Sequence, residues 1–521
     1  MENSDDNSEP DLGSQSPYEP VASNLGSVYP EAEEVVEATL VPAIPPPTPR
    51  PLSTSGYISW LFVLALTIGI TTIVATVQFM GEEEIGGDAG PIDLMQVQLQ
   101  GKFIVGHQEL SKFAPGAPAS PLPAELDTGC YEQRICYSIL LGEINSPTES
   151  LEYLEDLDAK AEEHGLELTE DQTRMRKLVY ELMGNYESEN PDSNAIPESD
   201  RQFLEDKLGW TGKLALYPSD SPHQSERSSV VSRAFGLTIS GLVAMMIGFL
   251  AGLAGFITAI VFSGLLLSGK LKARFANHPT DHNIYIETFA IWILFFFGAS
   301  ILSQYSDIED PAIKMMIHPI IFFGSLISLL WPVFRGVSFA QVRQDIGWRF
   351  ENPFKEILSA MGAYLALLPF MLPGLGLVVL LMNIIGLMGP EPHEFARQSG
   401  PGHPIQEDIM SGNFVTIFFV FIATCVAAPV VEETMFRGVL YRHLRDLTCS
   451  WSHVISVIFS AIANGLIFAA IHPQGIVAIP VLTTLAIGFT MARQWRDSLL
   501  APMTMHAIHN FLITCVSLLI L

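Results

Sequence analysis

Long apolar runs alternate with polar segments along most of the chain. The first run covers residues 57–80, carries no charge, and exceeds the roughly 20 residues that a membrane-spanning helix needs. The later runs cover residues 235–268, 283–303, 315–334, 356–388, 412–436, 453–471, 475–492 and 501–521. This pattern predicts an all-α, polytopic transmembrane helical bundle of about nine spans, and so a multi-pass protein of the cell membrane.

The segment between the first two runs has a different pattern. Between Thr148 and Tyr186, Leu and Tyr residues recur at helical spacing among charged residues, which is typical of amphipathic helices. Pro197-Glu198-Ser199-Asp200 is a second helix-start signal. Residues 81–229 are therefore predicted to form a helical soluble domain, to which the sequence assigns no chemistry.

The charge is concentrated in the polar segments. The chain has 27 Lys and Arg against 56 Asp and Glu, a net charge of −29, although 49% of it is hydrophobic. Residues 1–50 contribute −9, residues 81–229 contribute −19, and residues 230–521 contribute only −1. No basic face is available for nucleic acid, so a nucleic-acid partner is excluded. The Pro-rich residues 1–50 are predicted to be a disordered acidic tail.

Basic residues in the loops between runs indicate the orientation of the chain. Under the positive-inside rule, basic loops are cytoplasmic. This places the N-terminal tail in the cytoplasm and the 81–229 domain outside the cytoplasm. The residues that define the cytoplasmic side are Lys270, Lys272, Arg274, Arg335, Arg343, Arg349, Lys355, Arg437, Arg442, Arg445, Arg493 and Arg496.

Four of the five cysteines are considered for a disulfide or for packing within the spans. Cys130 and Cys136 fall in the predicted external domain, where an oxidising compartment permits a disulfide. Two thiols at this spacing are as often unpaired, so both states stay open. Cys425 and Cys515 lie inside apolar runs and are interpreted as small packing residues.

The first candidate for chemistry is an E-E-x-x-x-R pattern at the end of an apolar run. Ionisable groups inside spans cost about 2.5–3.5 kcal/mol each to insert, which makes them functional candidates. Glu433 and Arg437 are at positions i and i+4 of a helix, so they can pair. Glu432 is rotated about 100° away and escapes this pair, which leaves a carboxylate in an apolar setting as a candidate general base.

Two further polar positions interrupt the last spans. Phe468 and His472 share a helix face directly before Pro473, and His506 and Asn510 are again at i and i+4. Each motif alone has an ordinary structural interpretation: a surface ion pair, a satisfied histidine, and polar residues that join helices. Three such motifs in order, each on an apolar helix and able to face one interior, favour a common site.

Together the three motifs resemble those of the CAAX protease and bacteriocin-processing (CPBP) intramembrane proteases, also called the abortive-infection family. The family motifs are E-E-x-x-x-R, F-x-x-x-H and H-x-x-x-N, and all three are intact here. The resemblance covers roughly residues 340–521 and does not reach the N-terminal 230 residues. It implies a membrane endopeptidase like the type II CAAX prenyl endopeptidases, acting on a peptide or protein substrate at the bilayer.

The resemblance also implies a role for each site residue. Glu432 and His472 would activate a water, His506 and Asn510 would stabilise the oxyanion, and Glu433 with Arg437 would hold the first glutamate in place. A divalent metal such as Zn²⁺ bound by Glu432, His472 and His506 stays open, since these are zinc-ligand types without a local spacing signature. His509 is an ambiguous neighbour. The H-E-x-x-H pattern is absent, and His393-Glu394 is interpreted as a polar loop.

The sequence thus divides into a 1–50 tail, a 57–80 span, an 81–229 domain, 230–340 spans and a 341–521 protease-like core. Two alternatives are a membrane-embedded binding or immunity protein of the same fold and a transporter with an intramembrane ion pair. A transporter predicts repeated halves, and no internal repeat is found. One difficulty concerns the predicted spans: they put Glu432 and His472 at opposite ends of neighbouring helices, about 30 Å apart. A common site then needs broken, tilted or shorter helices, with residues 442–451 in the membrane interface.

Overall fold

The computed structural model describes most of the chain beyond residue 50. The described residues are 51–80, 85–113, 121–188, 192, 195–219, 223–275, 283–304, 308, 310–388, 393–396 and 413–520. The predicted disordered tail lies outside them. Within the described residues the secondary structure is helical and contains no strand, apart from one isolated bridge between Ile85 and Ala396.

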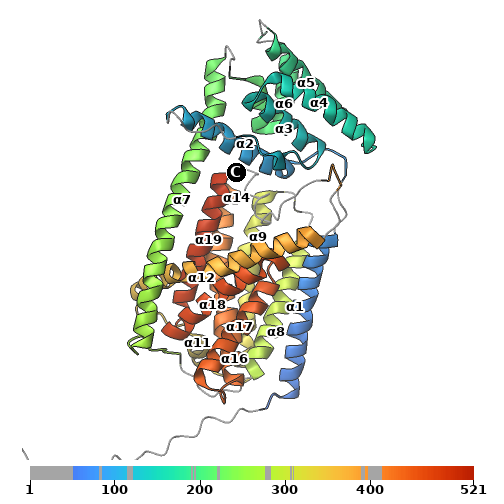
Figure 1. Ribbon diagram of the computed structural model, residues 1–521. Coiled ribbons are helices and arrows are strands. Elements are labelled where there is room, and N and C mark those ends of the chain that lie inside the picture. The colour runs from blue at the N-terminus through green and yellow to red at the C-terminus, as the bar shows by residue number, and fades with distance from the viewer. Residues whose placement is uncertain are drawn as a thin grey trace, which may run out of the picture. The chain divides into compact units, whose positions relative to one another are not determined.

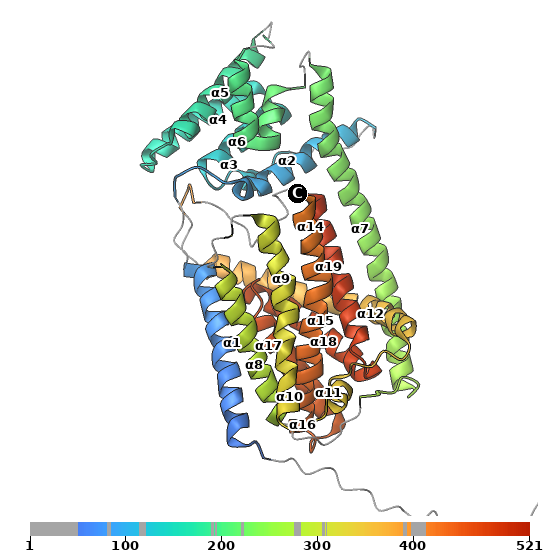
Figure 2. The ribbon, with the colours of Figure 1, turned by 180° about the vertical axis from the view of Figure 1, so that it is seen from behind.

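Nine helical segments are long and apolar enough to cross a membrane, which confirms the predicted number for the described residues. The spans are built from α1 (Thr54–Met80), α7 (Gln224–Leu267), α8 (Asn283–Gln304), α9 to α10 (Pro311–Phe334), α12 (Pro353–Met388), α14 to α16 (Phe414–Leu447), α17 (His453–Ala470), η5 and α18 (Ile476–Arg496), and α19 (Leu500–Ile520). In Figures 1 and 2, α1, α8 and α9 lie side by side at one edge of the bundle, and α7 lies at the other. α12 contains Pro369 and Pro373 and runs obliquely across its neighbours (Figure 1).

The sixth span is longer than the apolar pattern predicts. The helix continues without a break from Phe414 to Leu447, through α14 (Phe414–Phe421), η3 (Ile422–Ala427), α15 (Ala428–Glu433), η4 (Thr434–Leu440) and α16 (Tyr441–Leu447). The helix therefore continues past the predicted end at residue 436, and the placement of residues 442–451 in the membrane interface stays a prediction. The apolar run ends before Arg437 and Arg442, because hydropathy counts arginine as strongly polar. Both arginines are nevertheless buried inside the protein.

The buried arginines have carboxylate partners one turn away and an aromatic partner from a distant segment. Arg442 and Arg493 are at most 1% exposed, and their guanidinium groups lie 6.0 and 4.8 Å from the ring centre of Phe275. Arg442 Nε donates to Asp446 at 3.1 Å, and Arg493 pairs with Asp497. Paired in this way, a guanidinium avoids most of the cost of an isolated buried charge. The chain can therefore remain helical past Arg437.

Residues 85–219 are helical, and apolar side chains of these helices pack into a common core, so we refer to this region as the acidic domain. Its helices are α2 (Pro91–Ser111), η1 (Ala124–Leu126), α3 (Tyr131–Ile144), α4 (Pro147–Glu163), α5 (Glu170–Glu187) and α6 (Glu198–Leu216). The amphipathic stretch between Thr148 and Tyr186 is divided by Gly165, whose φ of +65° ends α4 in a conformation that glycine adopts at low cost. The core is formed by apolar side chains of these helices.

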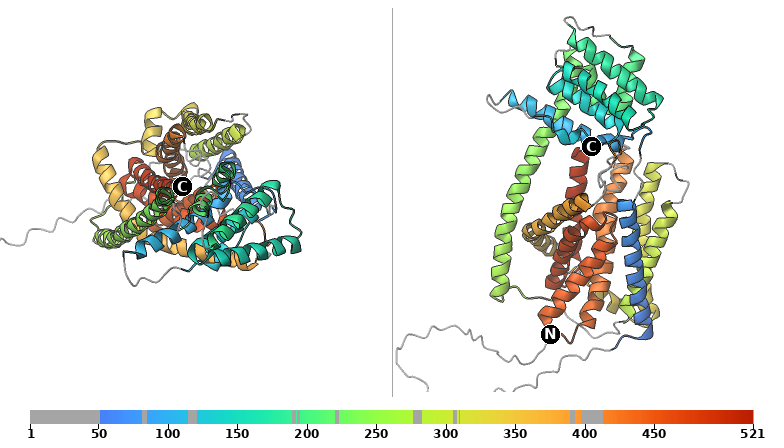
Figure 3. Two further views of the ribbon diagram at one scale, coloured as in Figure 1. Left: turned by 90° about the horizontal axis from the view of Figure 1, so that it is seen from above. Right: turned by 45° about the vertical axis from the view of Figure 1, so that its right-hand side comes forward.

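The helix α7 belongs to both parts of the molecule. It starts at Gln224, inside the predicted 81–229 domain, and Val230 and Ala234 are part of the domain's core. At Gly106 of α2, an added Cβ would lie 2.3 Å from the carbonyl oxygen of Ala234. A glycine at this position therefore allows α2 to pack directly on the α7 backbone. Figure 3 shows α7 continuing from this contact along the bundle.

A short described segment between α12 and α14 also packs into the domain. Phe395 is 1% exposed and belongs to the domain's core, with Arg134 5.0 Å from its ring centre. Arg134 also donates to the Glu394 carbonyl at 2.7 Å and pairs with the Glu394 carboxylate at 3.0 Å. His393 and Glu394 are therefore not part of a simple polar loop, because the residue that follows them is an apolar anchor.

The two domain cysteines are separate thiols. Cys130 and Cys136 are both free and buried, and Cys136 Sγ lies 3.0 Å from Thr211 Oγ1. Burial raises the pKa of each thiol to about 12, so little thiolate forms near neutral pH. Of the two states that the sequence left open, the structure has the unpaired one.

Candidate active site

The glutamate pair lies near the middle of the long sixth span. α15 carries both glutamates and is flanked by the π-helical turns η3 and η4, a feature that is common at functional sites. Arg437 Nη1 donates to Glu433 Oε1 at 3.0 Å, and both side chains are fully buried. Arg437 Nη2 also donates to the carbonyl of Ala486 at 3.2 Å. The predicted i, i+4 pair is thus present, and it ties α15 to α18.

His472 follows directly after the end of α17. Its Nδ1 lies 2.5 Å from the carbonyl oxygen of Phe468, one turn earlier. A carbonyl can only accept, so Nδ1 is the donor and Nε2 points away from α17. His472 Nε2 lies 3.7 Å from Glu432 Oε2. The helix end therefore turns the Nε2 edge of the ring toward Glu432.

His506 is held by the second glutamate. Its Nδ1 lies 2.8 Å from Glu433 Oε1, and its Nε2 lies 4.0 Å from Glu432 Oε2. The ring stacks on Phe489 with 5.2 Å between centroids. A carboxylate that accepts from Nδ1 fixes the ring orientation of a histidine, so Glu433 acts as an orienting group for His506.

Asn510 is one turn further along α19. Its Nδ2 donates to the carbonyl oxygen of Thr424 at 2.8 Å, in the π-helical turn before the glutamates. An amide nitrogen carries two N–H groups, so this bond uses one of them and fixes the direction of the other. Asn510 and His506 line the same cavity, although the bond to Thr424 was not expected from the sequence.

The long sixth span removes the 30 Å difficulty. From Glu432 to the end of α16 is roughly 15 residues, or about 22 Å at 1.5 Å per residue. The following helix α17 packs against α16 and returns over a similar length before it ends at Ala470. His472 therefore arrives beside Glu432. The sixth span is longer than predicted, whereas α17 ends within one residue of its predicted end.

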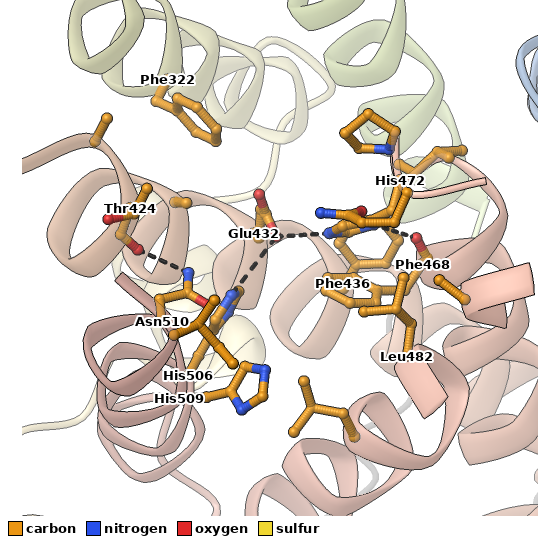
Figure 4. Close-up of a pocket in the computed structure, with 18 of the residues that line it drawn as sticks. Phe322, Thr424, Glu432, Phe436, Phe468, His472, Leu482, His506, His509 and Asn510 are labelled. Carbon is orange, nitrogen blue, oxygen red and sulfur yellow. Dashed lines mark hydrogen bonds and ion pairs between the residues drawn. The ribbon is translucent and has the colours of Figure 1, made fainter. Parts of the chain in front are cut away.

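A cavity of about 620 Å³ opens onto this group, and its walls are mostly apolar. Glu432, His472, His506 and Asn510 line it from three spans, and Figure 4 shows the two histidines on either side of Glu432. Helices outside these three supply other walls. They contribute Ile70 and Val74 from α1, Trp292, Phe296 and Phe297 from α8, and Met315, His318 and Phe322 from α9.

These wall residues were not identified from the sequence, because apolar residues on a span give no signal that separates a cavity wall from a lipid-facing surface. His509 also lines the cavity, but its Nδ1 lies 3.2 Å from Tyr364 Oη on α12. Among the described residues, no group of three or more His, Cys, Asp or Glu side chains has the spacing of a metal site. The metal suggested for Glu432, His472 and His506 stays a prediction.

Comparison with known proteins agrees with this geometry. Residues 414–512 match the model of the family described as type II CAAX prenyl endopeptidase Rce1-like. The chain is also 24% identical over 207 residues to the membrane-embedded CAAX protease MroQ of Staphylococcus aureus (strain USA300). That alignment covers 40% of this chain and 75% of the relative. No solved structure matches the chain.

Proposed function

We propose that this protein is an intramembrane endopeptidase that hydrolyses a peptide bond in a membrane-associated substrate. The observation that carries the proposal is the convergence of Glu432 Oε2 with His472 Nε2 at 3.7 Å and His506 Nε2 at 4.0 Å on the wall of an apolar cavity. The family match and the named relative support the same activity class.

In the proposed reaction, a water between Glu432 and His472 attacks the carbonyl carbon of the scissile bond. Glu432 takes one proton from the water as the new C–O bond forms, and the carbonyl oxygen becomes an oxyanion. The carbonyl then re-forms as the C–N bond breaks, and the proton is delivered to the leaving nitrogen. The products are a carboxylic acid and an amine, so atoms and charges balance.

His506 and Asn510 are proposed to stabilise the oxyanion. A His506 ring that already donates from Nδ1 to Glu433 can donate from Nε2 in its charged form, for which Glu433 supplies the counter-charge. The second N–H of Asn510 is the other donor. Donors fixed by Glu433 and Thr424 need no reorganisation during the reaction, which is the condition for effective electrostatic stabilisation.

We propose the substrate class of this protein from the names of its relative and of the matching family. MroQ is named a CAAX protease, and the match to the Rce1-like family points to substrates of the same kind. A cavity with apolar walls inside a membrane bundle suits a substrate that is itself held at the bilayer. Unprenylated membrane-associated peptides therefore belong in the same test as prenylated CAAX-type peptides.

The decisive experiment compares Glu432→Gln, His472→Ala and His506→Ala with the parent protein, reconstituted in lipid, on both kinds of peptide. We expect each variant to lose at least about 100-fold in kcat, the usual range for a lost general base or fixed donor. Glu351→Gln is the matched control, because Glu351 is an exposed carboxylate outside the cavity. Parent-like cleavage by all three variants would contradict the proposal.

The same preparation answers the question of a metal. Cleavage is measured before and after a chelator, and bound metal is determined in the parent and in His472→Ala. A metal held by the proposed residues would be lost with both treatments. Activity that survives the chelator, without bound metal, would assign water activation to Glu432 and His472 alone.

A further inference from the structure

The first span α1 lies outside the family match, yet it contacts the chain next to His472. Thr71 Oγ1 lies 2.8 Å from the carbonyl oxygen of Ala470, across almost 400 residues of sequence. Ala470 is the last residue of α17, and His472 follows two positions later. This is a direct polar contact between the first span and the segment that carries a proposed catalytic histidine.

The Ala470 carbonyl needs a partner from outside its own helix. The last four carbonyls of a helix have no intrahelical donor, and Pro473 in the following turn has no N–H to offer. Thr71 Oγ1 also lies 2.8 Å from the Thr67 carbonyl, but that oxygen is inside α1, where backbone N–H groups already donate to carbonyls one turn back. The Thr71 hydroxyl therefore contributes most by donating its hydrogen bond to the Ala470 carbonyl.

Other contacts show that α1 is seated against the core along its length. Trp60 Nε1 donates to His443 Nε2 on α16 at 2.8 Å, which fixes the first part of α1. Ile70, directly before Thr71, and Val74, about one turn after it, form part of the cavity wall. α1 thus contributes both to the support of His472 and to the space beside it.

We propose that α1 is a functional part of the catalytic unit, in which Thr71 is a positioning residue for His472. Its hydroxyl caps the end of α17, so the turn at residues 471–474 holds the His472 ring in the direction of Glu432. This inference rests on the proposed protease function for its kinetic consequence, but the contact itself can be tested without any cleavage.

The test compares Thr71→Val, Thr71→Ser and Thr72→Val with the parent in lipid. Thr71→Val keeps the shape and removes the hydroxyl, and Thr71→Ser restores it. Thr72→Val is the matched control, because Thr72 is exposed and its side chain is rotated about 100° around the same helix from Thr71. We expect Thr71→Val to lower kcat about tenfold with little change in KM, since a misplaced group slows the chemical step without removing the binding walls.

A second measurement does not depend on cleavage. Hydrogen exchange of the peptide that contains residues 468–476 is compared in the same four proteins, and we expect faster exchange in Thr71→Val only. Equal behaviour of Thr71→Val and Thr72→Val, or a Thr71→Ser protein no better than Thr71→Val, would overturn the proposal. Unchanged exchange in Thr71→Val would overturn it as well. If the parent cleaves nothing and Glu432→Gln changes nothing, the protease proposal fails, and the exchange result alone decides the role of Thr71.

Discussion

The acidic domain and the membrane bundle contain the same local ion pair in opposite surroundings. In α5, Lys177 Nζ lies 3.7 Å from Glu181 Oε1, and the two side chains are 74% and 47% exposed. In the sixth span, Arg437 lies 3.0 Å from Glu433, and both side chains are 0% exposed. Both pairs have the i, i+4 spacing that favours pairing on a helix. The spacing alone does not show how much a pair contributes to stability, because water screens the exposed pair and is absent from the buried one.

Breaking the buried pair is expected to have the largest effect on stability. Arg437→Met leaves the Glu433 carboxylate buried without its cation, and the expected loss is about 3–5 kcal/mol. The measurement is the thermal unfolding midpoint of the protein in lipid nanodiscs. The double variant Glu433→Leu with Arg437→Met removes both charges and should recover most of the loss. A single variant as stable as the parent would contradict this view of the site.

An effect of similar size, but confined to the acidic domain, is expected where the two regions meet. Phe395→Ala removes a fully buried ring from the core of the acidic domain, and a change of this kind costs about 3 kcal/mol or more. We expect faster limited proteolysis of the 85–219 domain. Phe113→Ala is the control, because Phe113 lies in the same region but is 78% exposed. Equal proteolysis of the two variants would show that the Phe395 contact does not support the domain.

The smallest effect is expected at the exposed pair. Lys177→Met should change the unfolding free energy of the acidic domain by less than about 0.5 kcal/mol, because exposed pairs gain little in water. Urea unfolding of the domain's tryptophan signal, at low and high salt, measures it. A loss as large as that of Arg437→Met would remove the distinction between the two regions.

The site was predictable as a set of residues because each motif is short. Glu433 with Arg437, and His506 with Asn510, depend only on the helical repeat, and hydropathy identifies the spans that carry them. The end of the sixth span was not predictable in this way. Hydropathy treats Arg442 and Arg445 as groups that need water, whereas their actual environment includes Phe275, more than 150 residues earlier in the chain.

What the sequence determined by itself is therefore local: an all-helical chain with nine candidate spans, an acidic domain with amphipathic helices, and three polar motifs in order. The tertiary structure decided which of these polar groups meet. It brought the Nε2 atoms of His472 and His506 within 4.0 Å of Glu432 Oε2, and it placed Thr71 against the end of α17. The physical reason is that helical periodicity repeats every few residues, while contacts between helices depend on packing over the whole bundle.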